Sequence, residues 1–316
     1  MPLLKRFADA LRGLFRSNAS PEEVAAERAA RLEQKVLRLV DNMPTMPDTA
    51  TQAMALLDDR DVKFAELATL IERDASIATG LLRVANSVLF AGGAPALKLD
   101  QAVVRLGTWQ CKNLIMAIGL RSLFRDAAGA TKSDCQALWH HGYVTASLCG
   151  QINRAYRLGF NGEEFSAGLL HDLGRILLAL ADPECLALAG AMDFREEGDV
   201  LGRERAAIGI DHCALGGWFG ELSNLPDALV QAIRCHHEPD QTDDPRRLVA
   251  LVATADHLAN HVQRGDDPGA YDPEANLGLA CLAERWTAAK RDSFLDDIPA
   301  LMEAAAQAAA REQAGL

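Results

Sequence analysis

The residues best suited to chemistry lie at the centre of the chain, where His171 and Asp172 stand side by side in an apolar run. Leucines and isoleucines flank this pair on both sides, together with small residues such as Gly174. An imidazole and a carboxylate carried into a protein interior cost free energy unless hydrogen bonds, an opposite charge or a metal ion compensates them. The pair is therefore a candidate for metal binding.

The other histidines extend this candidate site, because all eight lie between residues 140 and 261. The seven cysteines are single and form no CxxC pair, which disfavours a thiolate zinc site. The apolar helical face turns His141 inward and His140 outward, and an unpaired Asp256 in an apolar helix would be costly. His257 and His261 are expected to interact with the end of their helix instead. The candidate ligands, one or two on each of five successive helical segments, are His141, His171, Asp172, His212, His236, His237 and Asp256.

The composition is that of a globular protein of 316 residues, 49% hydrophobic and 24% charged. Aromatic residues make up only 5%, and alanine and leucine dominate, which favours helices over strands. A formal net charge of −12 argues against a broad basic surface, so direct nucleic-acid binding is not expected. The absence of a long apolar stretch or a signal peptide, together with the unpatterned cysteines, predicts a cytoplasmic protein.

The hydrophobic periodicity predicts an all-α chain. The first expected helix is basic and amphipathic and covers residues 1–18, and a second helix follows it, capped at Ser20. The first helix is interpreted as a terminal helix packed on its own domain, with weak peripheral membrane contact or partner docking as the alternative. The expected units are an N-terminal extension over residues 1–42, a helical subdomain over 43–126, a ligand-bearing helical unit over 134–262, and an acidic loop with closing helices over 263–316.

More detailed expectations concern individual helices. The dyad is expected inside one helix over residues 163–180, with its two side chains about 100° apart. Residues 203–222 are expected to form a helical stretch in which a helix opens after Asp211. Residues 127–133, which are small and polar, are interpreted as a linker, and Asn86 is interpreted as a capping or packing residue.

Taken together, the motifs resemble a known family. His141, the His171-Asp172 dyad followed by Gly174, His212, His236-His237 and Asp256 are similar to the ligands of the HD superfamily of metal-dependent phosphohydrolases. More closely, the chain resembles the HDOD domain, the HD-related output domain of bacterial signalling proteins. The segments that carry this resemblance are Met43-Pro-Thr-Met-Pro, Leu81-Leu-Arg-Val-Ala-Asn-Ser, Ala102-Val-Val-Arg-Leu-Gly, Leu138-Trp-His-His and Asp211-His212. They extend over about residues 40–260.

The resemblance implies an all-α HD-type bundle preceded by a helical subdomain, and a regulatory role in signal transduction. It implies one metal ion held by His141, His171, Asp172 and Asp256, and a second held by His212, His236 and His237, with Asp172 bridging. Iron or manganese is favoured for this ligand set, and zinc or magnesium is the alternative. Signalling proteins are the expected partners, and a nucleotide or cyclic dinucleotide is a candidate ligand.

Three interpretations of function follow. The favoured one is a regulatory module with a mono- or dinuclear metal centre that acts through protein partners or nucleotide sensing. The second is a metal-dependent phosphohydrolase or phosphodiesterase, in which Asp172 would be catalytic and Arg175 would contact the phosphate. The related HD-GYP branch hydrolyses cyclic di-GMP, but its Gly-Tyr-Pro segment is missing after Glu238. The third interpretation is a metal-free helical scaffold.

Overall fold

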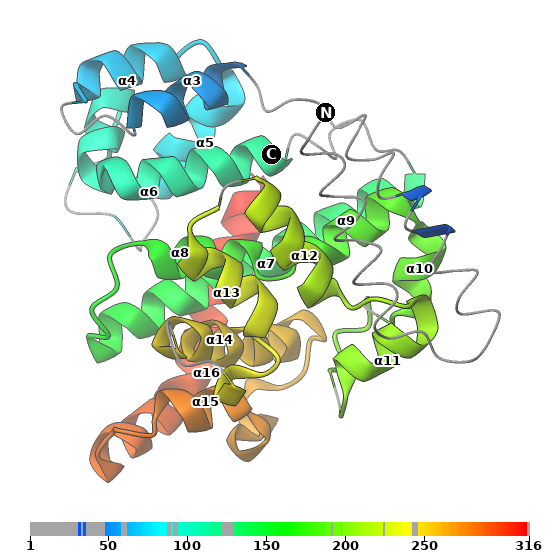
Figure 1. The fold of residues 1–316 in the computed structure, drawn as a ribbon. Helices are drawn as coiled ribbons and strands as arrows, with labels where there is room; N and C mark the ends of the chain where they lie inside the picture. Colours follow the sequence, from blue (N-terminus) through cyan, green and yellow to red (C-terminus); the bar gives the residue numbers. More distant parts are fainter. Residues whose placement is uncertain are drawn as a thin grey trace.

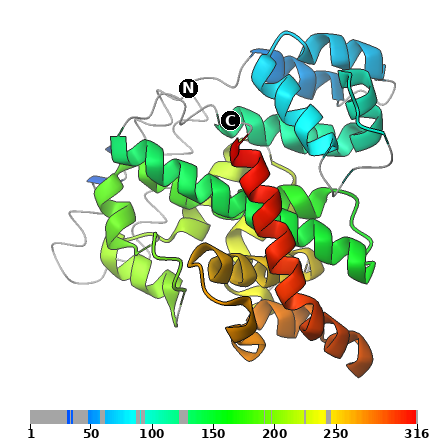
Figure 2. The same cartoon turned by 180° about the vertical axis from the view of Figure 1, so that it is seen from behind.

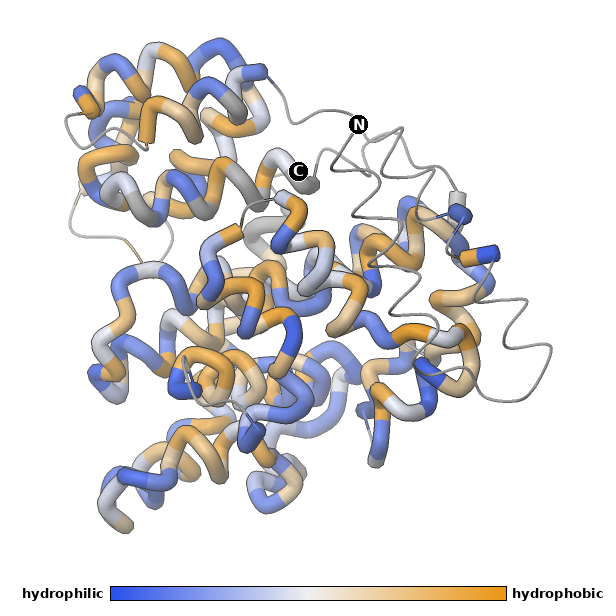
Figure 3. Tube along the Cα trace, viewed as in Figure 1, coloured by the Kyte–Doolittle hydropathy of each residue, from blue (hydrophilic) through white to orange (hydrophobic). Residues whose placement is uncertain are grey.

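A computed structural model describes residues 31–32, 34–35, 48–57, 62–86, 90, 94–121, 129–190, 192–196, 198–223, 225–241 and 246–314. These ranges contain helices, short 3-10 turns and no strand, which confirms the all-α prediction. Hydrophobic and hydrophilic stretches alternate along the helices, as amphipathic packing requires (Figure 3). None of the helices in these ranges is long and apolar enough to cross a membrane. The basic helix expected over residues 1–18 and the cap at Ser20 lie outside the described residues.

The first described helices form a small unit at one end of the molecule (Figure 1). They are α3 (Asp48–Leu57), α4 (Phe64–Ile71), α5 (Ala75–Ala85) and α6 (Leu99–Arg121), which pack against one another. Gly107, with φ +76°, interrupts α6. Asn86 caps α5 and clamps the following loop: its side chain donates to the Ala96 carbonyl at 2.8 Å and accepts from the Ala96 amide at 2.7 Å.

The remaining helices build a larger bundle around α7 (Gly129–Tyr156), which packs against α8 (Glu163–Leu170), α14 (Arg246–Gln263) and α16 (Ala288–Ala314). Helices α12 (His212–Leu222) and α13 (Asp227–Cys235) lie on one side of this bundle (Figure 1), and α16 crosses the opposite side (Figure 2). The other helices are α9 (Leu173–Ala181), α10 (Pro183–Leu188), α11 (Val200–Ile208) and α15 (Leu277–Leu282).

Several predicted helix boundaries were wrong. Helix α7 already begins at Gly129, so residues 129–133 of the expected linker are helical. The stretch over 203–222 is interrupted because Gly209 adopts φ +85° and ends α11, and the second helix opens after Asp211 as predicted. Helix α10 was not predicted, and it begins at Pro183, a residue that suits the first helical position.

The largest difference concerns the dyad itself. The single helix expected over 163–180 is broken into α8 and α9, with His171 and Asp172 in the turn between them. Asp172 has φ −95° and ψ 20°, outside the helical region, so the chain changes direction after His171. Gly174 then meets α12 closely: a Cβ at this position would lie 1.9 Å from the His212 carbonyl oxygen. Only glycine permits this approach, which brings the start of α12 to the dyad.

Candidate metal centre

Four histidines and two aspartates from five segments converge inside the larger bundle. His141 lies on α7, His212 begins α12, His236 follows the last residue of α13, and Asp256 lies on α14. With the dyad in the α8–α9 turn, they make one group in which no residue is more than 4% exposed. This degree of burial means that the polar atoms must be compensated from within the protein or by a bound ion.

The carboxylate of Asp172 occupies the middle of this group. Its Oδ1 lies 3.3 Å from His212 Nε2 and 3.7 Å from His236 Nε2, and its Oδ2 lies 3.7 Å from His171 Nε2 and 3.9 Å from His141 Nε2. Neither oxygen accepts a hydrogen bond from a described residue, although Asp172 is only 3% exposed. A buried carboxylate in this condition needs positive charge beside it.

Three of the imidazole rings are fixed through Nδ1, which leaves Nε2 directed at the centre. The acceptors near Nδ1 are the Gly168 carbonyl for His171 at 2.8 Å, the Ile233 carbonyl for His236 at 3.0 Å, and the Glu204 carboxylate for His212 at 2.7 Å. These partners assign the Nδ1–H tautomer, so the lone pair of each Nε2 faces Asp172. This arrangement is the usual one for metal-binding histidines.

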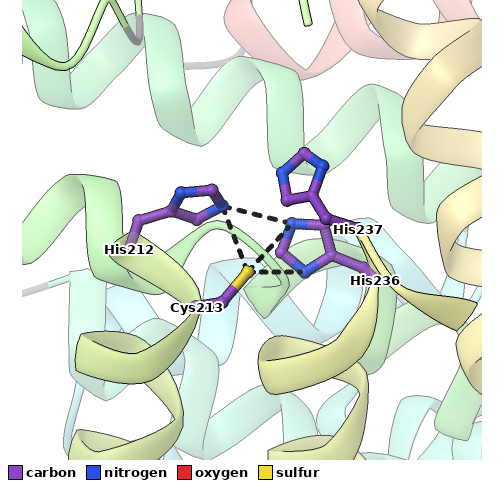
Figure 4. A group of neighbouring side chains, drawn as sticks. All are labelled: His212, Cys213, His236 and His237. Carbon is purple, nitrogen blue, oxygen red and sulfur yellow. Dashed lines mark hydrogen bonds between the residues drawn. The ribbon is translucent and has the colours of Figure 1, made fainter. Parts of the chain in front are cut away.

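The polar atoms separate into two groups that Asp172 joins. In the first, Oδ1 of Asp256 lies 2.9 Å from His141 Nε2 and 3.2 Å from His171 Nε2. The second contains His212, Cys213, His236 and His237, which come from the start of α12 and the end of α13 (Figure 4). The ligand atoms within each group lie close enough together to hold one ion. The structure thus brings every predicted ligand to one place and adds Cys213.

Glu204 is a site residue that the sequence analysis missed. It is fully buried on α11, and its Oε2 accepts from both the backbone amide of His212 at 2.8 Å and the ring. The adjacent Asp211 caps α12 by accepting from the Ala214 amide at 2.7 Å. Glu204 shares a helical face with the buried Val200 and Ile208, and an acid on such a face was the available signal.

Arg175 closes one side of the centre and is itself 1% exposed. Its Nε lies 3.4 Å from Asp172 Oδ1, and its Nη2 donates a short hydrogen bond to Glu196. Glu196 also accepts from Asn260 Nδ2 at 2.9 Å, and its other oxygen lies 3.8 Å from Nε2 of His237. The guanidinium predicted to meet a phosphate is therefore already engaged by two carboxylates. No periodic pattern in the sequence marked Glu196.

Burial lowers the pKa values of several of the histidines in the centre, whereas negative charges beside them raise these values. Burial disfavours the charged form of His171, but the negative charges of Asp172 and Asp256 outweigh it and raise the pKa of His171 to about 9. Burial and the neighbouring His212 lower the pKa of His237 to about 3, and burial holds the pKa of His236 well below its usual range. A metal-free centre therefore carries a proton on His171, which a bound cation would displace.

The two histidines of α14, His257 and His261, contact the acidic loop that follows this helix. Nδ1 of His257 lies 2.7 Å from the Tyr271 hydroxyl, and Nε2 of His261 lies 2.8 Å from the Asp267 carbonyl oxygen. They contact the loop rather than the end of their own helix, and neither joins the groups of potential ligands.

A cavity of about 320 Å³ borders the centre on the side of His237 and Asp256. Glu196, Glu238 and Asn276 contribute polar groups to its wall. Its volume is at the lower end of the range for small-molecule pockets. A small ligand could therefore reach the second group of potential ligands without unfolding the bundle.

The HDOD domain model matches residues 43–239, well over half of the chain. The chain belongs to the HDOD domain family. This confirms the resemblance inferred from the motifs. An uncharacterized protein of Treponema pallidum (strain Nichols) is 23% identical over 254 residues, which are 80% of this chain and 48% of the relative. The chain thus spans about half the length of the curated relative that it matches.

Solved structures of similar proteins share the HDOD fold. An HDOD domain protein of unknown function from Geobacter sulfurreducens is 20% identical with a TM-score of 0.63, and the match covers 88% of this chain and 98% of that one. A candidate metal-dependent phosphohydrolase from Shewanella amazonensis SB2B is 18% identical with a TM-score of 0.60, covering 89% and 99%. A candidate signal transduction protein from Marinobacter aquaeolei VT8 is 21% identical with a TM-score of 0.56, covering 94% and 68%.

Proposed function

We propose that this HDOD protein is a metal-binding regulatory module of bacterial signal transduction, acting through protein partners or nucleotide sensing. The main support for a bound metal ion is the carboxylate of Asp172. It is buried and accepts no hydrogen bond, and four imidazole Nε2 atoms lie within 3.9 Å of it. Arg175 places one positive charge 3.4 Å from Oδ1 of this carboxylate, and a divalent cation would compensate the two oxygen atoms that accept no hydrogen bond. Names given to similar proteins, signal transduction protein and metal-dependent phosphohydrolase, fit both parts of the proposal.

The donor set fits one or two ions. His141, His171 and Asp256 would hold one ion and His212, His236 and His237 a second, with Asp172 between them. Imidazole and carboxylate ligands suit iron, manganese and zinc, and magnesium less well. When bound, such ions supply Lewis acidity and positive charge for a phosphate or another anion.

The ion pairs that Arg175 makes with two carboxylates favour the regulatory role. Its guanidinium is paired with Asp172 and Glu196, and Asn260 holds Glu196 in that position. A substrate phosphate would have to displace Glu196 before it reached the guanidinium. The pairing therefore favours a metal centre with a regulatory role over a metal centre that catalyses the turnover of a substrate.

The proposal is tested by elemental analysis of the purified protein beside the His171→Ala, Asp172→Ala double variant. We expect one or two equivalents of iron, manganese or zinc in the wild type and their loss in the variant. The same metal-loaded protein should bind a partner or a nucleotide without turning the nucleotide over. Metal content that is negligible, not restored by added ions and unaffected by the substitutions would overturn the proposal.

A metal-dependent phosphohydrolase is the second candidate function, because the potential ligands for two ions are complete and a cavity borders them. In this case Asp172 would belong to the catalytic centre, and Arg175 would bind phosphate after Glu196 moved away. Hydrolysis of a nucleotide or cyclic dinucleotide by the metal-loaded wild type, abolished in Asp172→Ala, would establish it. A fully metallated protein that is inert across these substrates would exclude it.

A further inference from the structure

We propose that Cys213 is a ligand of the second ion, so that a thiolate joins His212 and His236 in holding it. This inference rests on the metal centre of the proposed function and deepens it, because it identifies the chemical class of the ion. A site with sulfur selects zinc or ferrous iron over manganese and magnesium. Neither the sequence spacing nor the family resemblance assigned this cysteine a role.

The thiol lies among the imidazole nitrogens that face the centre. Sγ of Cys213 is 3.4 Å from Nε2 of His212 and 3.9 Å from Nε2 of His236, and the two Nε2 atoms are 3.3 Å apart (Figure 4). In a tetrahedral zinc site, two nitrogen ligands lie about 3.3 Å apart, and a nitrogen and a sulfur ligand lie about 3.5 Å apart. The three atoms thus already have nearly the separations of ligands that share one ion.

Independently of the cysteine, the surroundings of the two imidazole nitrogens indicate a bound cation. The Nδ1 atoms of His212 and His236 face protein acceptors, so the Nε2 lone pairs of both rings are directed at each other across 3.3 Å. The unbonded Oδ1 of Asp172 lies on the same side, at 3.3 and 3.7 Å from these two nitrogens. A cation relieves the repulsion among all these atoms at once.

Cys213 differs from the neighbouring cysteine in what it contacts. It is 2% exposed, and its sulfur contacts Nε2 of His212 and both ring nitrogens of His236. Cys235 precedes His236 directly, but its Sγ faces the Gln231 side chain at 3.7 Å. On binding, the S–H bond of Cys213 breaks, a sulfur–metal bond forms and one proton leaves to solvent.

The test uses cobalt(II) in the full chain, because a thiolate bound to cobalt(II) absorbs strongly in the near ultraviolet through charge transfer and imidazole does not. Metal-stripped wild type, Cys213→Ala and the control Cys235→Ser are titrated with cobalt(II) while bound metal is counted. We expect the charge-transfer band in the wild type and in Cys235→Ser. In Cys213→Ala the band should be lost and one equivalent should bind at least about 10-fold more weakly.

The outcomes separate the two proposals. Cobalt bound by the wild type without a charge-transfer band, or with a band that survives in Cys213→Ala, overturns the sulfur ligand and leaves the metal centre standing. No binding of cobalt at all, or of iron, manganese or zinc in the same assay, overturns the metal centre and this inference with it. X-ray absorption of the zinc-loaded wild type needs no variant: a sulfur neighbour at about 2.3 Å supports Cys213, and its absence overturns it.

Discussion

Oδ1 of Asp172 and Nε2 of His212 lie 3.3 Å apart although Asp172 stands in the turn between α8 and α9 and His212 begins α12. Two local features create this relationship: the turn at the dyad, and the contact of Gly174 with the backbone of α12. The carboxylate is thereby held between the two groups of potential ligands, beside the His212 imidazole of the second group. The centre depends on a backbone approach as much as on its ligands.

Gly174→Ala should damage the centre without touching a ligand. The new Cβ would lie 1.9 Å from the His212 carbonyl oxygen, so α9 and α12 must separate. We expect a loss of at least about 2 kcal/mol in the free energy of unfolding, and reduced metal content. Urea denaturation and elemental analysis measure both. Gly269→Ala is the control, since its Cβ meets nothing nearer than 3.5 Å, and equal stability of the two variants would contradict the prediction.

Asp172→Asn should lower metal content while keeping the shape of the side chain. The amide has no negative charge, and this position lies between both groups of potential ligands. We expect at least one equivalent of metal to be lost, together with the metal-dependent part of the melting temperature. Calorimetry with and without chelator measures this. A chelator effect as large in the variant as in the wild type would show that Asp172 is not a ligand.

The sequence predicted the all-α fold and the residues of the centre because both depend on local patterns. Buried polar residues in apolar helices mark a shared interior, and helical periodicity shows which face holds them. It did not predict the turn at the dyad, since this break arises where α9 meets α12. Cys213 and Glu196 were missed for a related reason: only the tertiary packing brings the Cys213 sulfur to His236 and the Glu196 carboxylate to Arg175.

The combined contribution of His171 and His237 to the stability of the metal-free protein should be greatest near pH 6.5. The pKa of His171 rises from 6.5 to about 9 on folding, so its contribution is complete below pH 6.5 and is lost as the pH rises through 9. The pKa of His237 falls from 6.5 to about 3, so the unfolded chain gains more protons and stability decreases as the pH falls below 6.5.

Urea denaturation of the chelator-treated protein from pH 4 to pH 9 measures this profile. Metal should abolish the decline above pH 6.5, because a coordinated His171 carries no proton in the folded state. His171→Gln should weaken this decline in the metal-free protein, and the part that remains comes from His212, whose pKa Glu204 and Asp172 also raise. A metal-free wild type whose stability continues to rise up to pH 9 would contradict the assignment.

Asn86→Ala should weaken the small helical unit and spare the metal centre. The side chain makes two hydrogen bonds to the backbone of Ala96 and accepts a third from Arg105 at 3.2 Å. Their loss should cost about 1–2 kcal/mol in the free energy of unfolding, with unchanged metal content. Gln307→Ala, exposed on α16, is the control for a surface substitution. Unchanged stability with altered partner binding would instead show that Asn86 recognises a partner.

Arg175→Met should be more destabilising than Glu196→Gln. Removing the guanidinium leaves Asp172 and Glu196 in the interior without their shared cation, a loss of about 3–5 kcal/mol. The Glu196→Gln amide can still accept from Asn260. Burial and the neighbouring Asp256 also raise the pKa of Glu196 to about 7, so its carboxyl is partly protonated at neutral pH and its replacement costs less.

The same two variants separate the two candidate functions. Glu196→Gln frees Arg175 from its closest partner, so a phosphohydrolase held closed by that pair should gain turnover or phosphate affinity. A regulatory module should gain neither, and Arg175→Met should then alter only stability and metal content. Calorimetry of phosphate binding and assays of nucleotide turnover, both on metal-loaded protein, distinguish the two candidate functions. Increased turnover in Glu196→Gln would favour the enzyme, since it would show that the Arg175–Glu196 pair restrains catalysis.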